Sequence, residues 1–313
     1  MQTFIQSKSN CFGWCSYMHA TLNQNPLLFH KIGFKPTKTF GTPTHSSSIF
    51  SKATRSDTSS TELPVMSGVE DKYREAGLRR DRMPEHVAVI LDGNRRWFKK
   101  RGLELDYEPF LRHNLLVADL CIKWGIGTTT CFIYALENMR RTQETNELIF
   151  RQFEKFLAEN LENFLRKNMK VSVIGESSMY PESLKDMIKQ VEEATTKFSK
   201  LELMFAVCYG GTRDVLHAAR SICRNVKDGV VEPEDVSEKL VEQALYTKMS
   251  RAPQVDLLIR TGGHLRLSNY LMWQIAEAEL YFTNSETMAP NFGEHVFLDA
   301  LRSYQQTERT FGK

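Results

Sequence analysis

Short runs of apolar and β-branched residues alternate with amphipathic stretches of helical periodicity along most of the chain. The expected strands cover 86–93, 128–136, 171–177, 201–211, 255–263 and 278–284. The expected helices cover about 109–124, 143–168, 180–198, 211–228 and 235–248. Continuous apolar strands separated by helices are typical of parallel sheets whose faces are covered by helices. The sequence therefore predicts an α/β fold with a central, mostly parallel sheet flanked by helices.

The bulk composition restricts the classes of function. The chain has 313 residues, of which 41% are hydrophobic, enough for a large core, and its formal net charge is only +3. A charge this small does not favour nucleic-acid binding by the chain as a whole. No apolar run reaches the 18 or so residues that a membrane-spanning helix needs. We expect neither a nucleic-acid partner nor a transmembrane segment.

The first 56 residues differ from the rest of the chain. They contain no Asp or Glu, carry several Lys and Arg residues, and are dense in Ser and Thr. This composition is typical of an organelle transit peptide, and the excess of Ser and Thr over Arg favours the plastid over the mitochondrion. The alternative is a generic disordered tail. We expect a transit peptide over 1–56, a polar linker over 57–72 and one folded domain over 73–313.

Four of the expected strands end in Gly, Asn, Arg or acidic residues. The ends read DGNRRW after the first strand, LENMRR after the second, YGGTRD after the fourth and RTGGHLRLSN after the fifth. In open parallel sheets the ligand crevice lies beyond the carboxyl ends of the strands. We therefore expect these four segments to form one site.

The first of these segments places the single carboxylate Asp92 beside a group of cations. A carboxylate at a strand end is suited to Mg²⁺, and the planar groups of Arg95 and Arg96 are suited to phosphate oxygens. Arg140, Arg141, Arg260 and Arg266 come from other strand ends, and a diphosphate between them would relieve their mutual repulsion. Two alternatives are a solvated rim in which Asp92 is only an ion-pair partner and a phosphatase with Asp92 as nucleophile. The phosphatase pattern usually has a second Asp where this chain has Asn94.

Apolar residues near these charges point to a hydrocarbon substrate. Trp97, Phe98, Phe110, Leu111 and Leu115 follow the first strand. The alternative is that they are ordinary core residues. Glu279 lies on the last expected strand, and a buried carboxylate there needs a cation or a metal as partner.

Several segments together resemble the cis-prenyltransferases, the undecaprenyl diphosphate synthase family. They are HVAVILDGNRRW, YALENMRR, FAVCYGGTRD, LLIRTGGHLRLSNYLMWQIAEAELYF and FLDALRSYQQTERTFG, in the family's order over about residues 82–312. The resemblance implies a non-Rossmann α/β fold with a hydrophobic tunnel, and a homodimer. It also implies Mg²⁺-dependent condensation of isopentenyl diphosphate with an allylic diphosphate to form a Z double bond.

The resemblance also implies roles for individual residues. Asp92 would bind Mg²⁺ and diphosphate, Asn138 would take part in proton removal, and Glu279 would be a second metal-linked acid. The remaining residues implied to bind the diphosphate substrates are Gly93, Asn94, Arg95, Arg96, Trp97, Glu137, Arg141, Arg260, Arg266 and Ser268.

The chain departs from the family's pattern at positions near the substrates. Ala135 stands where a small hydroxyl residue is usual, Met139 where Trp is usual, and His264 where Glu is usual. The segment LELDYEPFLRHN has no counterpart of the family's Gly-His segment. We expect a short product of the neryl or Z,Z-farnesyl type, as in short-chain plastid relatives. The alternatives are irregular coupling of two dimethylallyl units and a non-catalytic subunit that supports another prenyltransferase.

Overall fold

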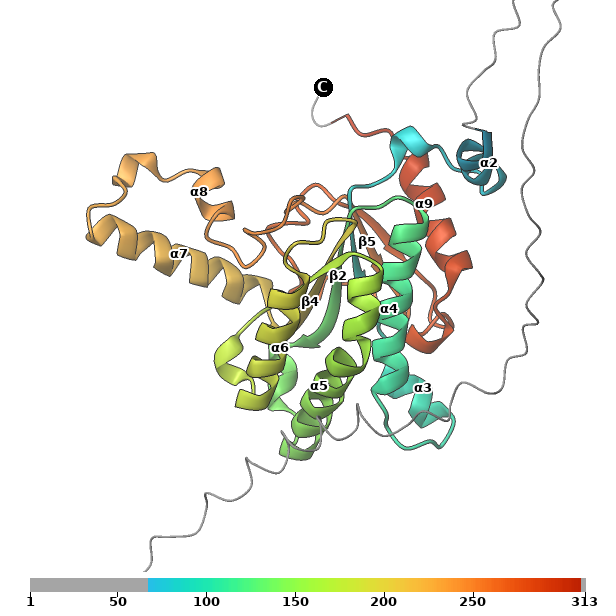
Figure 1. Ribbon diagram of the computed structural model, residues 1–313, viewed down its shortest axis with the longest axis horizontal. Coiled ribbons are helices and arrows are strands. Elements are labelled where there is room, and N and C mark those ends of the chain that lie inside the picture. The colour runs from blue at the N-terminus through green and yellow to red at the C-terminus, as the bar shows by residue number, and fades with distance from the viewer. Residues whose placement is uncertain (1–66, 311–313) are drawn as a thin grey trace, which may run out of the picture. The chain divides into compact units, whose positions relative to one another are not determined.

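The computed structural model describes residues 67–310, and within them the chain forms one six-stranded sheet (Figure 1). Its strand order is β3-β4-β2-β1-β5-β6, and every pair of neighbours is parallel. The strands are β1 (His86–Ile90), β2 (Thr128–Ala135), β3 (Met169–Ile174), β4 (Leu201–Tyr209), β5 (Leu257–Arg260) and β6 (Glu279–Phe282). All six expected strands and the predicted fold class are confirmed.

The helices follow the expected alternation with some differences. They are α2 (Ser67–Glu75), α3 (Asn94–Lys100), α4 (Glu108–Lys123), α5 (Gln143–Arg166), α6 (Glu182–Thr195), α7 (Gly211–Lys227), α8 (Glu238–Glu242) and α9 (Glu294–Gln306). We did not predict α2, α3 or α9, and α2 begins inside the expected linker. The helix expected over 235–248 is limited to α8, and beyond it Asp214 accepts a hydrogen bond from the amide of Tyr246 at 2.8 Å.

The two faces of the sheet are buried against different partners. In β1, Val87 and Val89 belong to a large core shared with α4, α5, α6 and α9, while Ala88 and Ile90 face the opposite side. That second side packs against Tyr270 and its neighbours in the segment after β5. Because both faces are covered, β1 contains no polar alternation and is buried throughout.

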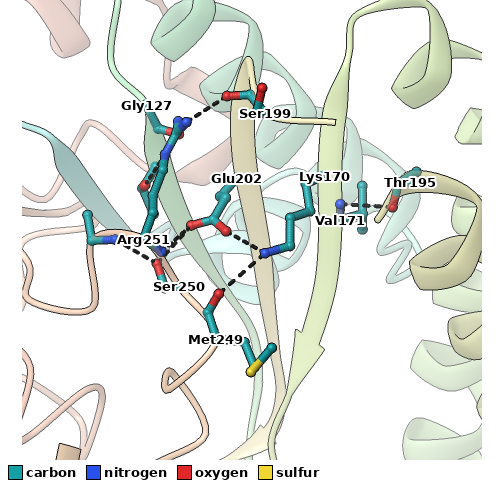
Figure 2. Close-up of polar contacts among 11 residues, drawn as sticks. Gly127, Lys170, Val171, Thr195, Ser199, Glu202, Met249, Ser250 and Arg251 are labelled. Atoms are coloured by element: carbon teal, nitrogen blue, oxygen red, sulfur yellow. Dashed lines mark hydrogen bonds and ion pairs between the residues drawn. The ribbon is translucent and has the colours of Figure 1, made fainter. Parts of the chain in front are cut away.

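A polar network ties together the amino ends of the strands (Figure 2). Glu202 accepts hydrogen bonds from Lys170 at 2.7 Å, from Ser250 at 3.0 Å and from the amide of Arg251 at 2.8 Å. The guanidinium of Arg251 donates in turn to the carbonyl oxygens of Ser199 and Gly127. These bonds fix the loops at the end of the sheet that lies away from the DGNRRW segment.

The strand order places a topological switch point at β1. The chain passes from β1 to β2 on one side, and it later returns to β5 on the other side. At such a point the flanking loops diverge and leave a crevice beyond the carboxyl ends of the strands. The segments after β1, β2 and β5 meet there.

The predicted transit peptide and most of the predicted linker lie outside the described residues. Across 67–310, no helix combines the length and apolar content that a membrane crossing requires.

Candidate active site

Asp92 is fixed by main-chain contacts two residues after β1. Its carbonyl oxygen accepts hydrogen bonds from the Thr261 hydroxyl and from the Ala289 amide, both at 2.8 Å. Its side-chain oxygen Oδ1 accepts from the Gly93 amide at 2.6 Å. The carboxylate is therefore held at the carboxyl end of the sheet, with 27% of its side chain exposed.

Two glycines allow this close packing. Gly93 has φ 103°, and a Cβ atom there would lie 2.8 Å from the Cβ of Met288. Gly262 has φ 85°, and a Cβ atom there would lie 2.6 Å from a guanidinium nitrogen of Arg96. Larger residues would clash and would also adopt an unfavourable backbone conformation.

The Asp92 carboxylate lies between two guanidinium groups. Arg260 donates to Oδ2 at 2.9 Å, and a nitrogen of Arg96 lies 3.4 Å from Oδ1. Burial is the largest influence on the Asp92 pKa and raises it. The hydrogen bond from Arg260, the charges of Arg260 and Arg96 and the Gly93 amide together outweigh burial and lower the pKa below its ordinary value. Asp92 is therefore a carboxylate at neutral pH.

Arg260 links Asp92 to the segment that follows β5. Its side chain is only 3% exposed, and it donates to the Ser268 hydroxyl at 2.7 Å and to the carbonyl oxygen of Arg266. One guanidinium thus organises three of the predicted site residues.

A cavity of about 290 Å³ lies beside Asp92 at the carboxyl end of the sheet. The family resemblance implies a hydrophobic tunnel. Beside Asp92, the described residues form this cavity. Its lining includes ten of the thirteen predicted site residues, which we call the polar wall: Asp92, Gly93, Asn94, Arg95, Arg96, Asn138, Arg141, Arg260, Arg266 and Ser268. We call the other lining residues, which are largely apolar, the apolar wall: Ile90, Leu91, Tyr107, Phe110, Phe132, Ile133, Tyr134 and Ala135.

Several polar atoms in the polar wall have unused hydrogen-bonding capacity. Within the described part of the chain, Oδ1 of Asn94, Nε of Arg260 and the Arg96 nitrogen that lies 3.4 Å from Asp92 are buried without a hydrogen-bond partner. Unpaired buried groups are costly unless a ligand satisfies them. Since two of the three are guanidinium nitrogens, an anionic ligand fits this wall.

Arg141 is held at the border between the two walls. Its guanidinium donates to the Tyr107 hydroxyl at 3.2 Å and lies 5.4 Å from the centre of the Tyr134 ring. The Tyr134 hydroxyl in turn donates to Oδ1 of Asn146 at 2.5 Å and lies 3.1 Å from the carbonyl oxygen of Asn138. The cation is therefore fixed where polar and apolar groups meet.

Three predicted site residues do not line the cavity. Trp97 donates from its ring nitrogen to Oδ1 of Asn291 at 3.1 Å. The guanidinium carbon of Arg101 lies over the Trp97 ring, 3.9 Å from the ring centre. Glu137 is exposed and accepts from Asn269 at 2.7 Å.

Glu279 is the clearest correction. It pairs with Leu257 at the amino end of β5, whereas Asp92 follows the carboxyl end of β1. Because the strands are parallel, Glu279 and Asp92 lie toward opposite ends of the sheet. The two acids do not form a joint metal site within this chain.

The apolar wall includes residues that we did not assign to the site. Tyr107 has no motif that marks it, Tyr134 opens the segment YALENMRR but was given no role, and Phe110 was treated as either substrate contact or core. The signal for Tyr134 was its position in the second strand, because residues just before a strand's carboxyl end border the crevice.

Residues 90–312 match the protein family described as "Putative undecaprenyl diphosphate synthase". The chain is 44% identical over 238 residues to cis-prenyltransferase 4, chloroplastic, of Solanum lycopersicum, covering 75% of this chain and 77% of that protein. It is also 44% identical over 232 residues to (2Z,6Z)-farnesyl diphosphate synthase CPT6, chloroplastic, of the same plant, covering 74% and 79%.

The fold is similar to a solved structure as well. Lavandulyl diphosphate synthase from Lavandula x intermedia, crystallised with dimethylallyl diphosphate, superposes with a TM-score of 0.72 at 34% identity. The match covers 74% of this chain and 100% of that one.

Proposed function

The chain belongs to the undecaprenyl diphosphate synthase family, the cis-prenyltransferases, and we propose that it condenses dimethylallyl diphosphate with isopentenyl diphosphate. The proposed product is a short Z-prenyl diphosphate of the neryl or Z,Z-farnesyl type. The observation that carries this proposal is a single cavity lined both by several arginines, two of which share the one carboxylate of Asp92, and by apolar side chains. These two walls match the diphosphate and the hydrocarbon of such a substrate.

Mg²⁺ fits this site as an ion shared with the substrate. Across 67–310, no group of three or more His, Cys, Asp or Glu side chains could hold a metal alone. Mg²⁺ commonly binds through one or two carboxylates together with substrate phosphates and water, and Asp92 supplies one partly exposed carboxylate. When bound, Mg²⁺ would neutralise charge on the departing diphosphate.

The protein's own groups have distinct roles in the proposed reaction. The allylic C1–O bond breaks and releases diphosphate, and C1 bonds to the terminal alkene carbon of isopentenyl diphosphate. Arg95 and Arg96 stabilise the charge on the leaving diphosphate, while Arg141, Arg266 and Ser268 hold the second diphosphate. Arg260 orients Asp92 and Ser268. The condensed product then loses a proton to the released diphosphate, either directly or by way of Asn138, which lines the cavity.

The cavity size supports a short product. Small-molecule sites usually enclose about 300 to 1,000 Å³, and this cavity of about 290 Å³ is just smaller than that range. Phe110 and Phe132 bound it on the apolar side. A long polyprenyl chain would require these side chains to move.

A second candidate is irregular coupling of two dimethylallyl diphosphates. It is favoured by the similarity to lavandulyl diphosphate synthase over that enzyme's whole length. The partner-subunit alternative is less favoured, since Asp92, Arg96 and Arg260 form a charged site whose isolated charges would be costly to maintain.

The assay that separates these outcomes uses the chain without residues 1–56. It is incubated with Mg²⁺ and dimethylallyl diphosphate, alone and with isopentenyl diphosphate, and dephosphorylated products are identified by gas chromatography with mass detection. A short Z-prenol that requires both substrates is the expected result. A branched C10 alcohol from dimethylallyl diphosphate alone would indicate irregular coupling, and no product would favour the partner-subunit role.

We further propose that residues 1–56 direct the protein to the plastid. The relatives named above as chloroplastic support this proposal. Fluorescent fusions with and without these residues test it, and a diffuse signal from the full-length fusion would contradict it.

A homodimer is proposed as the active form. Helix α7 supports it, because the helix extends away from the sheet in Figure 1 and leaves Leu216 42% exposed. Light scattering on the purified protein gives the mass in solution, and a monomeric mass would contradict the proposal.

A further inference from the structure

We propose that Asn269 and Glu137, neither of which lines the cavity, act as positioning residues for the two lining residues beside them, Ser268 and Asn138. We call the contact between Asn269 and Glu137 the clasp. The inference rests on the proposed function, since it assigns the clasp to diphosphate binding in that reaction.

The clasp joins the ends of three strands. The Asn269 side-chain amide donates to Oε1 of Glu137 at 2.7 Å, and Glu137 follows β2. The Asn269 side-chain oxygen accepts from the Thr212 amide at 2.9 Å, and its main-chain oxygen accepts from the Gly211 amide at 2.6 Å. Both of these amides lie at the start of α7, directly after β4. Asn269 itself belongs to the segment that follows β5.

Each clasp residue is a direct neighbour of a cavity residue. Ser268 precedes Asn269, and Asn138 follows Glu137. Consecutive Cα atoms are about 3.8 Å apart and joined by a rigid peptide unit, so a shift of the clasp is passed to both neighbours. Ser268 also accepts from Arg260 at 2.7 Å, which connects the clasp to the partner of Asp92.

The backbone at Ser268 needs external support. Ser268 has φ 53° and Asn269 has φ 56°, both in the left-handed region. Asn tolerates this region better than most residues, whereas Ser does so less readily. Such conformations persist where surrounding contacts determine them, and the hydrogen bonds of Asn269 supply those contacts.

The carboxylate of Glu137 has a structural partner rather than a cationic one. Among residues 67–310, no Lys, Arg or His lies within ion-pair distance of it. Its role in the clasp is therefore to accept a hydrogen bond, which an amide oxygen could also do. A direct role as a charged ligand would instead require the carboxylate.

A charge-balanced pair of substitutions tests the clasp. Asn269→Asp keeps an oxygen for the Thr212 amide and tolerates the left-handed backbone, but it places a carboxylate against Glu137. Glu137→Gln retains an acceptor for Asn269. The double variant has the wild-type net charge, and it restores the hydrogen bond with donor and acceptor exchanged.

The primary measurement is the affinity for inorganic diphosphate with Mg²⁺ by calorimetry. We expect Asn269→Asp to weaken it about tenfold, Glu137→Gln to change it less than about twofold, and the double variant to recover to within about threefold of wild type. In steady-state kinetics, Asn269→Asp should raise KM for isopentenyl diphosphate more than KM for the allylic substrate.

The clasp would be overturned by a double variant no better than Asn269→Asp, by a Glu137→Gln variant as impaired as Asn269→Asp, or by a wild-type protein that does not bind inorganic diphosphate. A lowered melting temperature with unchanged affinities would also overturn it, because that is the signature of a merely structural contact. A wild-type protein that binds diphosphate but forms no prenyl product would refute the proposed function instead.

Discussion

The buried guanidinium of Arg260 donates to Oδ2 of Asp92 at 2.9 Å, while Arg96 approaches the other carboxylate oxygen at 3.4 Å. A single carboxylate thus balances two cations, one of which is almost fully buried. Removing one member of a buried ion pair leaves the other charge uncompensated. The cationic wall can therefore exist without ligand only because Asp92 is present.

Replacing Asp92 by Asn should have opposite effects on two measurements. Turnover with Mg²⁺ should fall by at least about 10²-fold, the typical loss when stabilisation of transition-state charge is removed, because Asp92 would hold the Mg²⁺ that supplies it. Affinity for inorganic diphosphate without metal should rise, because Arg96 and Arg260 lose their internal anion. Calorimetry in the presence of a chelator measures the second effect. Asp299→Asn, which removes an exposed partner of Arg302 on α9, is the control and should change neither quantity.

Tyr107 is expected to hold Arg141 in place for the diphosphate. Tyr107→Phe removes the 3.2 Å hydrogen bond and leaves the apolar wall intact. KM for a diphosphate substrate should rise about three- to tenfold, in keeping with the roughly 0.5 to 1.5 kcal/mol that a typical hydrogen bond contributes. Tyr281→Phe on β6 is the matched control. An unchanged KM in Tyr107→Phe would show that Arg141 is positioned by other contacts.

Much of the fold was readable from the chain because its dominant signal is local. Both faces of the sheet are covered, so strands such as 86–93 appear as unbroken apolar runs between polar ends. The same pattern predicted that Asp92, Asn138 and Arg260 lie together at the carboxyl end of the sheet. The short helix α3 was missed because NRRWFKK carries no apolar periodicity, and its start depends on Gly93.

The remaining parts depend on contacts that sequence spacing does not reveal. Glu279 was misplaced because a motif match gives no strand register, and the register sets it opposite Leu257. Glu137 stands beside Asn138 in one motif, yet its side chain turns outward to Asn269. The Tyr107–Arg141 contact joins residues 34 positions apart, so neither residue predicts the other.

Enlarging the apolar wall should lengthen the product. Phe110 is 5% exposed and lines the cavity from α4, so Phe110→Ala adds room for further isoprene units. The same change should cost about 3 to 5 kcal/mol of stability, as for other buried Phe residues. Product chain lengths at several ratios of isopentenyl diphosphate to allylic primer provide the readout. Leu115→Ala on the same helix, outside the cavity lining, should keep the wild-type product. A Phe110→Ala enzyme with unaltered products would place the limit on chain length elsewhere.

Acid sensitivity should arise partly from His86, which is buried in β1. Its Nδ1–H donates to the carbonyl oxygen of Gln254 at 3.1 Å, because a carbonyl can only accept, and Nε2 then accepts from Thr130 at 2.8 Å. Burial lowers the pKa of His86 to about 4, although the nearby acids Asp256 and Glu202 act in the opposite direction.

The sign of the pH effect follows from this lowered pKa. The unfolded chain takes up a proton on His86 below about pH 6.5, whereas the folded protein does so only near pH 4. The stabilisation is complete above pH 6.5 and is lost as the pH falls toward 4. Between pH 7.5 and 5, His86 alone should lower the free energy of unfolding by about 2 kcal/mol.

Urea unfolding of wild type and His86→Gln at both pH values isolates this contribution, since the amide side chain can make the same two hydrogen bonds without titrating. His295→Gln, an exposed control, should retain the wild-type pH dependence, and a His86→Gln protein that loses as much stability as wild type would refute the assignment.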